Sequence, residues 1–142
     1  MCKKKKVDLF IKVCQNLKGE FCDRFQLFTT GKIKKGKEKY IIEYDNEYHG
    51  TSTILLKDDG RANIKTNGDI NYVLNLDKEK KTKFNISTKD TFSNFYVNTK
   101  NVFFNINENG GNINFEYDLE IDNVGGMLST KINIELKSWN FS

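Results

Sequence analysis

The chain has 142 residues and a formal net charge of +4 at pH 7. A chain of this length forms one domain and buries about two thirds of its extended surface, so its core needs neither disulfides nor metals. Four positive charges lie in the run Lys3 to Lys6, and the only arginines are Arg24 and Arg61. This argues against nucleic-acid binding, because phosphate and base contacts favour clustered arginine.

The single domain is predicted to cover residues 1–142, with a disordered basic tail at 1–5 and a C-terminal tail at 138–142. Cys2, Cys14 and Cys22 have no metal-ligand spacing, and the lone His49 does not complete a zinc set with them. We therefore expect free thiols, no metal and no other cofactor. No apolar run of signal-peptide or membrane-spanning length is present, which favours a cytoplasmic protein without a membrane partner.

Apolar and polar residues alternate along most of the chain, which is the pattern of strands with one buried face. Tight turns are expected at Asp58 to Gly60, at Asn67 to Asp69 and at Asn123 to Gly126, where Asn, Asp and Gly suit hairpin geometry. A charged loop is expected at 77–83. The predicted strands cover residues 6–17, 21–35, 39–45, 51–57, 61–66, 70–76, 83–88, 94–99, 101–107, 112–122 and 131–137.

No stretch carries apolar residues at helical spacing over a useful length, so the sequence predicts an all-β fold. Turns recur about every ten residues, and nearly all connections are short enough for hairpins. Consecutive hairpins favour a single antiparallel, mostly up-and-down β-barrel of about eight to ten strands over a sandwich, since a barrel also removes exposed sheet edges.

Several segments resemble one family. They are G-R-A-N-I-K-T-N-G at 60–68, K-D-T-F-S-N-F-Y-V-N-T-K at 89–100, and G-N-I-N-F-E-Y-D-L-E-I at 111–121. Together with F-Q-L-F-T-T-G-K-I at 25–33, they are similar in order and length to the YwiB-like family of uncharacterised bacterial proteins. The resemblance implies a calycin-type barrel, similar in outline to lipocalins, and it implies no catalytic residues.

The residues themselves point to no enzyme. His49 has no Ser or Cys and carboxylate at a recognisable spacing, so it is interpreted as a solvated turn histidine. The carboxylates of the 112–122 strand alternate with its apolar residues, about 7 Å apart, and are interpreted as a solvated face. These carboxylates are Glu116, Asp118, Glu120 and Asp122.

Alternation places many aromatic side chains inside the barrel, where tyrosine hydroxyls require partners. Either these rings fill a solid core, or they line a cavity for a small, partly apolar ligand whose carboxylate is anchored by Arg61 or Arg24. A cavity above about 300 Å³ would favour the ligand. The predicted ligand-binding residues are Tyr40, Tyr44, Tyr72, Phe104, Phe115, Tyr117 and Arg61.

The alternative to ligand binding is a structural or interaction protein with a side-chain-filled barrel and an external working surface. Exposed aromatic residues would then provide that surface. The candidates are Phe10, Phe103 and Trp139. The oligomeric state and the partner's identity are left open by the sequence.

Overall fold

The computed structural model describes residues 4–17, 21–107, 109–121 and 127–138. All of its regular structure is β-strand, and none of the described residues forms a helix long and apolar enough to cross a membrane. The strands are β1 (Lys4–Leu17), β2 (Phe21–Gly36), β3 (Lys39–Asp45), β4 (Thr51–Lys57), β5 (Ala62–Asn67), β6 (Ile70–Leu76), β7 (Thr82–Thr88), β8 (Phe92–Asn107), β9 (Gly110–Ile121) and β10 (Met127–Ser138).

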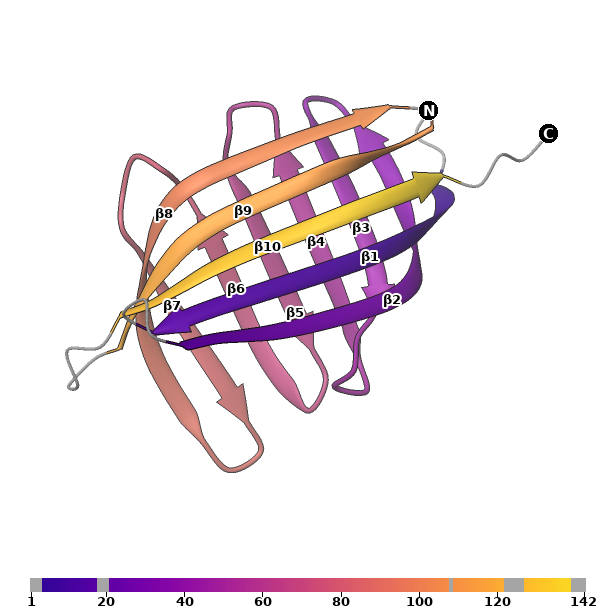
Figure 1. Ribbon diagram of the computed structural model, residues 1–142. Helices are drawn as coiled ribbons and strands as arrows, with labels where there is room; N and C mark the ends of the chain where they lie inside the picture. The colour runs from indigo at the N-terminus through magenta and orange to yellow at the C-terminus, as the bar shows by residue number, and fades with distance from the viewer. Residues whose placement is uncertain (1–3, 18–20, 108, 122–126, 139–142) are drawn as a thin grey trace.

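The ten strands form a closed antiparallel barrel in which each strand pairs with its neighbours along the chain. The barrel is closed by β1, which pairs with β2 on one side and with β10 on the other. Figure 1 shows the indigo β1 beside the yellow β10, with both crossing the front of the barrel. The predicted all-β, up-and-down barrel is confirmed.

The predicted break between two strands at residue 100 is wrong. Residues 94–99 and 101–107 were expected to form separate strands, but they belong to the single strand β8. A β-bulge lies between Thr99 and Asn101, which pair with Tyr117 and Glu116 of β9. The extra residue, Lys100, resets the inside-outside alternation, so in the sequence it looks like the end of a strand.

Several strands begin earlier than their side-chain patterns indicate, and β1 and β10 are the clearest cases. β1 already pairs with β2 at Lys4 and Lys5, inside the segment expected to be disordered. β10 begins at Met127 rather than at Lys131. The ladder bonds join backbone groups, so pairing continues past the last alternating side chain. The expected turn at 123–126, Trp139 and the first three residues of the chain lie outside the described residues.

Among the described side chains, every strand except β2 contributes a fully buried residue to one apolar cluster, and Leu27 and Ile33 of β2 pack against it. In its middle level, Ile42, Ile54, Ile64 and Leu74 lie directly opposite one another across β3, β4, β5 and β6. The cluster consists of Val7, Leu9, Ile11, Ile42, Ile54, Leu56, Ala62, Ile64, Leu74, Leu76, Phe84, Val97, Ile113, Phe115, Tyr117, Leu119, Ile134 and Leu136.

Cys14 is disulfide-bonded in the structure. The expectation of three free thiols is therefore wrong, because a disulfide takes up two of the three cysteines. The sequence favoured the cytoplasm partly because cytosolic thiols are kept reduced. That argument no longer applies to Cys14, and the cytoplasmic location stays a prediction.

Candidate functional site

One end of the barrel interior is lined by hydroxyl groups. Tyr44, Ser52, Thr66 and Tyr72 lie directly opposite one another across β3 to β6, next to the level of isoleucines and Leu74. The Ser52 and Thr66 side chains are buried, and their hydroxyl oxygens are 3.0 Å apart. At this level of the barrel, the inward side chains of β3 to β6 therefore carry hydroxyl groups, whereas the neighbouring level is apolar.

A second polar row lies on the other side of the barrel. Thr99, Tyr117, Thr130 and Gln15 are opposite one another across β8, β9, β10 and β1. Thr130 is 1% exposed, and its Oγ1 makes no hydrogen bond with any described residue. Burial raises the pKa of the Tyr117 hydroxyl, and the Thr130 hydroxyl, which lies near it, lowers that pKa. The two hydroxyl groups are nevertheless not placed to form a hydrogen bond. Thr130 is therefore a buried polar group that needs a partner.

A cavity of about 340 Å³ lies between the two rows, and we call it the hydroxyl cavity. Its polar wall comes from the two rows and from the β3–β4 turn, and its apolar floor is formed by isoleucines of the core. The volume is above the approximately 300 Å³ that favours a ligand over a solid core. The described lining residues are Ile11, Val13, Gln15, Phe25, Leu27, Tyr44, Asn46, Glu47, Tyr48, Ser52, Ile54, Ile64, Tyr72, Tyr117, Thr130, Ile132 and Ile134.

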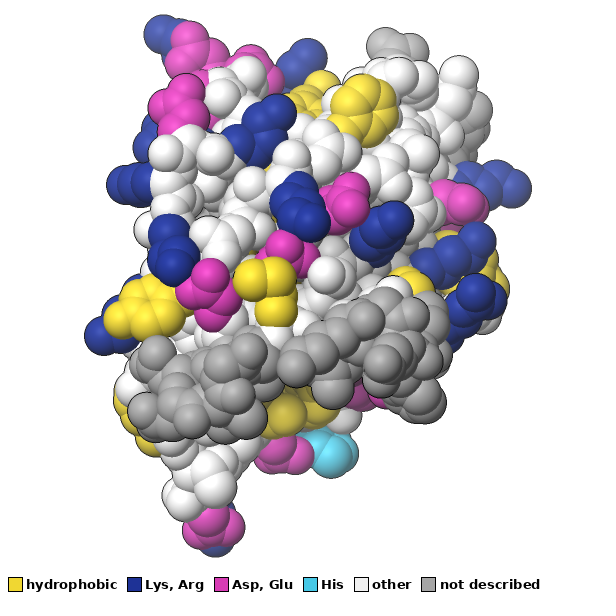
Figure 2. Space-filling view, turned by 60° about the vertical axis from the view of Figure 1, so that its left-hand side comes forward, with side chains coloured by type: hydrophobic (Ala, Val, Ile, Leu, Met, Phe, Trp, Pro, Cys, Tyr) yellow, Lys and Arg dark blue, Asp and Glu magenta, His cyan; other side chains and the backbone are white. Residues whose placement is uncertain are grey.

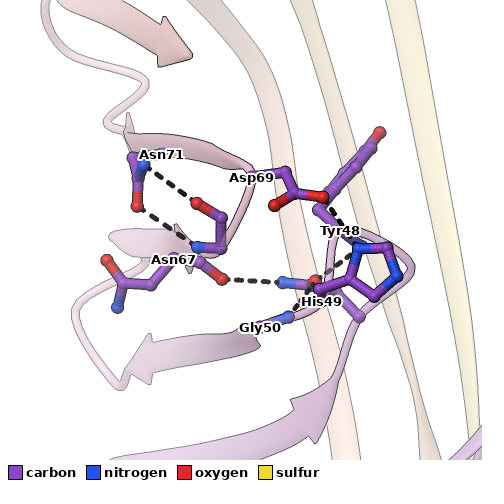
Figure 3. Close-up of polar contacts among 8 residues, drawn as sticks. Tyr48, His49, Gly50, Asn67, Asp69 and Asn71 are labelled. Atoms are coloured by element: carbon purple, nitrogen blue, oxygen red, sulfur yellow. Dashed lines mark hydrogen bonds and ion pairs between the residues drawn. The ribbon is translucent and has the colours of Figure 1, made fainter. Parts of the chain in front are cut away.

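The β3–β4 turn forms part of the rim and is held by hydrogen bonds of the Asn46 side chain and of the neighbouring β5–β6 turn. Asn46 Oδ1 accepts hydrogen bonds from the amides of Tyr48 (2.8 Å) and Gly50 (3.2 Å), while Asn46 Nδ2 donates to Ser52 Oγ at 3.0 Å. The amide of Asp69, in the β5–β6 turn, donates to the Tyr48 carbonyl at 2.7 Å. The two turns therefore support each other, as Figure 3 shows, and fix Glu47 and Tyr48 at the rim.

His49 lies in the same turn with a positive φ of 54°. Its Nδ1 is 2.7 Å from Asp69 Oδ2, and both side chains are mostly exposed (Figure 3). The His49 side chain does not line the hydroxyl cavity. His49 therefore ties the two turns together at the surface, which is consistent with its interpretation as a turn histidine.

The cavity tyrosines are protected from ionisation. Burial raises the pKa of Tyr44 to about 12, although the Ser52 hydroxyl partly opposes this shift. Burial likewise raises the pKa of Tyr72 and of Tyr117, opposed by Thr66 and Thr130. Near neutral pH, the cavity therefore presents neutral phenol hydroxyls, each able to donate and to accept a hydrogen bond.

Comparison with known proteins places this barrel in a family. Residues 11–134 match a domain of unknown function, DUF1934. The chain belongs to this family. No curated protein matches the sequence.

The DUF1934 chain is also similar to a solved structure, the crystal structure of the YwiB protein from Bacillus subtilis. The two share 17% sequence identity with a TM-score of 0.78, and the match covers 94% of each chain. The resemblance to a YwiB-like family is thus confirmed. At this identity the likeness shows the fold alone.

Three of the seven predicted ligand-binding residues of this DUF1934 chain line the hydroxyl cavity: Tyr44, Tyr72 and Tyr117. The other four lie elsewhere. Tyr40 packs edge-on against Phe104, with ring centroids 6.0 Å apart, and Phe115 is buried in the apolar core. Arg61 is exposed in the β4–β5 turn, where its Nη2 is 2.6 Å from Asp59 Oδ2. Arg61 therefore does not supply the cavity with a positive charge.

The sequence reasoning missed the hydroxyl residues between the tyrosines. Ser52, Thr66 and Thr130 occupy inward positions of strands whose other inward residues are almost all apolar. Such a polar residue on the buried side of an alternating pattern is a signal that was available in the sequence. Its meaning depends on which strands meet, because the three residues are far apart along the chain.

The predicted solvated carboxylates of β9 are mostly engaged with lysines instead. Asp118 is only 6% exposed; Ser129 donates a hydrogen bond of 2.8 Å to its Oδ1, and Lys100 Nζ lies 3.2 Å from its Oδ2. The interpretation of a solvated face is therefore wrong for Asp118. Figure 2 shows basic and acidic side chains mixed over one face of the barrel. The ion pairs of β9 are Glu116 with Lys131, Asp118 with Lys100 and Glu120 with Lys81.

The raised tyrosine pKa values predict a loss of stability in alkali. Above pH 10 the unfolded chain loses phenol protons that folded Tyr44, Tyr72 and Tyr117 keep, so the free energy of unfolding falls as the pH rises towards 12. Each such tyrosine contributes a slope of about 1.4 kcal/mol per pH unit. Urea unfolding at pH 9.5, 10.5 and 11.5 should show this fall, and the Tyr44→Phe variant should show a smaller one. An equal slope in both proteins would contradict the prediction.

Proposed function

We propose that this DUF1934 chain is a non-enzymatic protein that binds a small, partly apolar ligand in the hydroxyl cavity. The observation that carries the proposal is the buried Thr130 hydroxyl, which faces the cavity without a hydrogen-bond partner among the described residues. A buried polar group left in this state costs about 1 to 3 kcal/mol. A ligand with its own donor or acceptor would remove that cost.

The cavity has the two-part character of a small-molecule site. Its polar wall carries the hydroxyls of Tyr44, Tyr72 and Tyr117, whereas Ile54 and Ile134 lie among the apolar residues of its floor. Binding sites of this kind combine an apolar surface with a few fixed polar groups that orient the ligand. We expect the ligand to be small, because about 340 Å³ is near the lower limit of known ligand cavities.

A non-enzymatic role is favoured by the chemistry of the wall. Among the described lining residues there is no His, Cys or Lys, and the one carboxylate belongs to Glu47, an exposed residue of the β3–β4 turn. The Ser52 hydroxyl is hydrogen-bonded to Asn46 and Thr66. The phenols are held in their neutral form, and a phenol of raised pKa is a poor base near pH 7. The wall is therefore suited to hydrogen bonding.

Native mass spectrometry of protein purified from cells tests the proposal. We expect a small molecule to co-purify and to be released on denaturation. The Tyr117→Phe variant removes one cavity hydroxyl and little volume, and it should weaken ligand binding by about 1 to 3 kcal/mol if that hydroxyl is a partner. Tyr40→Phe is the matched control, because Tyr40 points into the barrel but does not line the cavity. Its binding should equal that of the wild type.

The absence of any co-purifying molecule, together with a crystal structure whose cavity is filled by side chains, would contradict ligand binding. The external surface would then be favoured. There, Phe10 stacks on Phe28 with ring centroids 4.0 Å apart, and Phe28 is 74% exposed. Phe103 is 49% exposed on β8. The stacked pair of Phe10 and Phe28 and the ring of Phe103 are candidates for contact with a protein partner. The absence of a nucleic-acid or membrane partner stays a prediction.

A further inference from the structure

Glu47 is the one charged side chain among the described residues that line the hydroxyl cavity. It makes no ion pair with a described residue. Burial is the main cause of the raised pKa of Tyr44, Tyr48 and Tyr72, and the charge of Glu47 adds to each shift. The negative field of this carboxylate therefore extends over the polar wall.

The rings of the cavity add to this negative character. Tyr44, Tyr48, Tyr72 and Tyr117 all line it, from β3, the β3–β4 turn, β6 and β9. The face of an aromatic ring attracts cations through its quadrupole, and groups of such rings recognise alkylammonium ligands. The phenol oxygens and Thr130 Oγ1 can also accept hydrogen bonds from an N–H group. An anionic ligand would meet Glu47 without a compensating positive charge from any described lining residue.

We propose that the ligand of the hydroxyl cavity is a small organic cation, an ammonium or quaternary ammonium group with short apolar substituents. The cation lies against the tyrosine rings with Glu47 as its counter-charge at the rim. This inference rests on the proposed function, since it names the chemical class of the same ligand. It replaces the expectation of a carboxylate ligand anchored by Arg61 or Arg24, because Arg61 pairs with Asp59 in another turn and neither arginine lines the hydroxyl cavity.

The position of Glu47 keeps the desolvation cost of binding a charged ligand low. Its side chain is in the exposed β3–β4 turn, so the ion pair forms at the mouth, where water still reaches both charges. A fully buried ion pair would incur a desolvation cost that often exceeds its attraction. The apolar substituents can then occupy the isoleucine floor, including Ile54, Ile64 and Ile134.

Calorimetric titration with two ligands of the same shape tests the charge preference. Choline carries a quaternary nitrogen, and 3,3-dimethylbutan-1-ol has a neutral carbon in the same place. We expect choline to bind about tenfold more tightly than the neutral alcohol, given the size of cation–ring and rim-charge interactions. Both titrations use the full chain at low ionic strength, since added salt weakens a rim ion pair.

Two variants locate the source of the preference. Glu47→Gln removes the rim charge and should reduce the preference for choline severalfold, while binding of the neutral alcohol stays unchanged. Glu43→Gln is the matched control, because Glu43 lies exposed on β3, does not line the cavity and pairs weakly with Lys4 at 3.8 Å. It makes the same change of charge and should leave the preference as in the wild type.

The outcomes separate this inference from the proposed function. Equal affinity for choline and the neutral alcohol, or a preference that Glu47→Gln does not alter, would overturn the cation assignment and leave ligand binding intact. The same holds if choline fails to bind at about 10 mM while native mass spectrometry finds a neutral or acidic molecule in the protein. If neither probe binds and nothing co-purifies, the proposed function fails as well.

Discussion

Replacing Phe115 by alanine is expected to lower the free energy of unfolding by about 3 to 5 kcal/mol. Phe115 is 1% exposed in the middle of β9, where Val102 and Ile132 lie opposite it on the two neighbouring strands. Its ring is enclosed by the barrel wall, which is fixed by hydrogen bonds on both sides and collapses little around a missing side chain. The loss therefore includes a cavity term in addition to the lost transfer free energy.

Urea unfolding followed by circular dichroism measures this effect. Phe103→Ala is the control on the adjacent strand, because Phe103 is half exposed on the outer face of β8. We expect its cost to be below about 1 kcal/mol, as is usual for surface substitutions. A loss of similar size in the two variants would show that Phe115 is not part of a closed core.

Replacing Gly50 by alanine is expected to cost about 3 kcal/mol and to weaken ligand binding at the same time. A Cβ at Gly50 would lie 1.7 Å from the carbonyl oxygen of Asn67, which belongs to the backbone and cannot rotate away. The β3–β4 and β5–β6 turns would have to separate. Because Tyr48 and Glu47 are carried by the first of these turns, the rim of the hydroxyl cavity would move with it.

Gly36→Ala is the matched control for this substitution. A Cβ at Gly36 would meet only the flexible side chain of Lys39, at 3.2 Å. Thermal unfolding of the two variants should differ clearly, with Gly50→Ala the less stable. If Gly50→Ala unfolds at the wild-type temperature, the close approach of the two turns is not maintained in solution.

The fold was largely predictable because each barrel strand has one face towards the core. In β9, the alternation of Ile113, Phe115, Tyr117 and Leu119 with polar residues defines both the strand and its inward side. The pattern failed where the backbone departs from regular pairing, at the bulge around Lys100, and where backbone pairing continues without apolar side chains, at Lys4. At both places the alternation of side chains stops although the backbone pairing continues.

The candidate site was only partly predictable, because it depends on register between strands. Alternation correctly placed Tyr40, Tyr44 and Tyr117 on inward faces, but it gave no height along the barrel axis. Tyr44 lies level with Ser52 in the polar row, while Tyr40 lies opposite Leu56 at the other end of the strand. The same limitation left Arg61 as a possible anchor. Arg61 precedes the start of β5, whereas the cavity lies at the other end of this strand, near Thr66.

The pairing of β1 with β10 also has a consequence for folding. β1 is the first strand of the barrel along the chain and β10 is its last, so the pairing of Leu9 with Leu136 joins residues that are far apart in the sequence. During synthesis, one edge of β1 stays without its partner until β10 has emerged. Long-range pairings of this kind slow folding, and an unpaired edge is prone to aggregation. The same adjacency makes this barrel a suitable candidate for circular permutation, in which a short linker joins the end of β10 to the start of β1 and a new start is placed in an exposed turn.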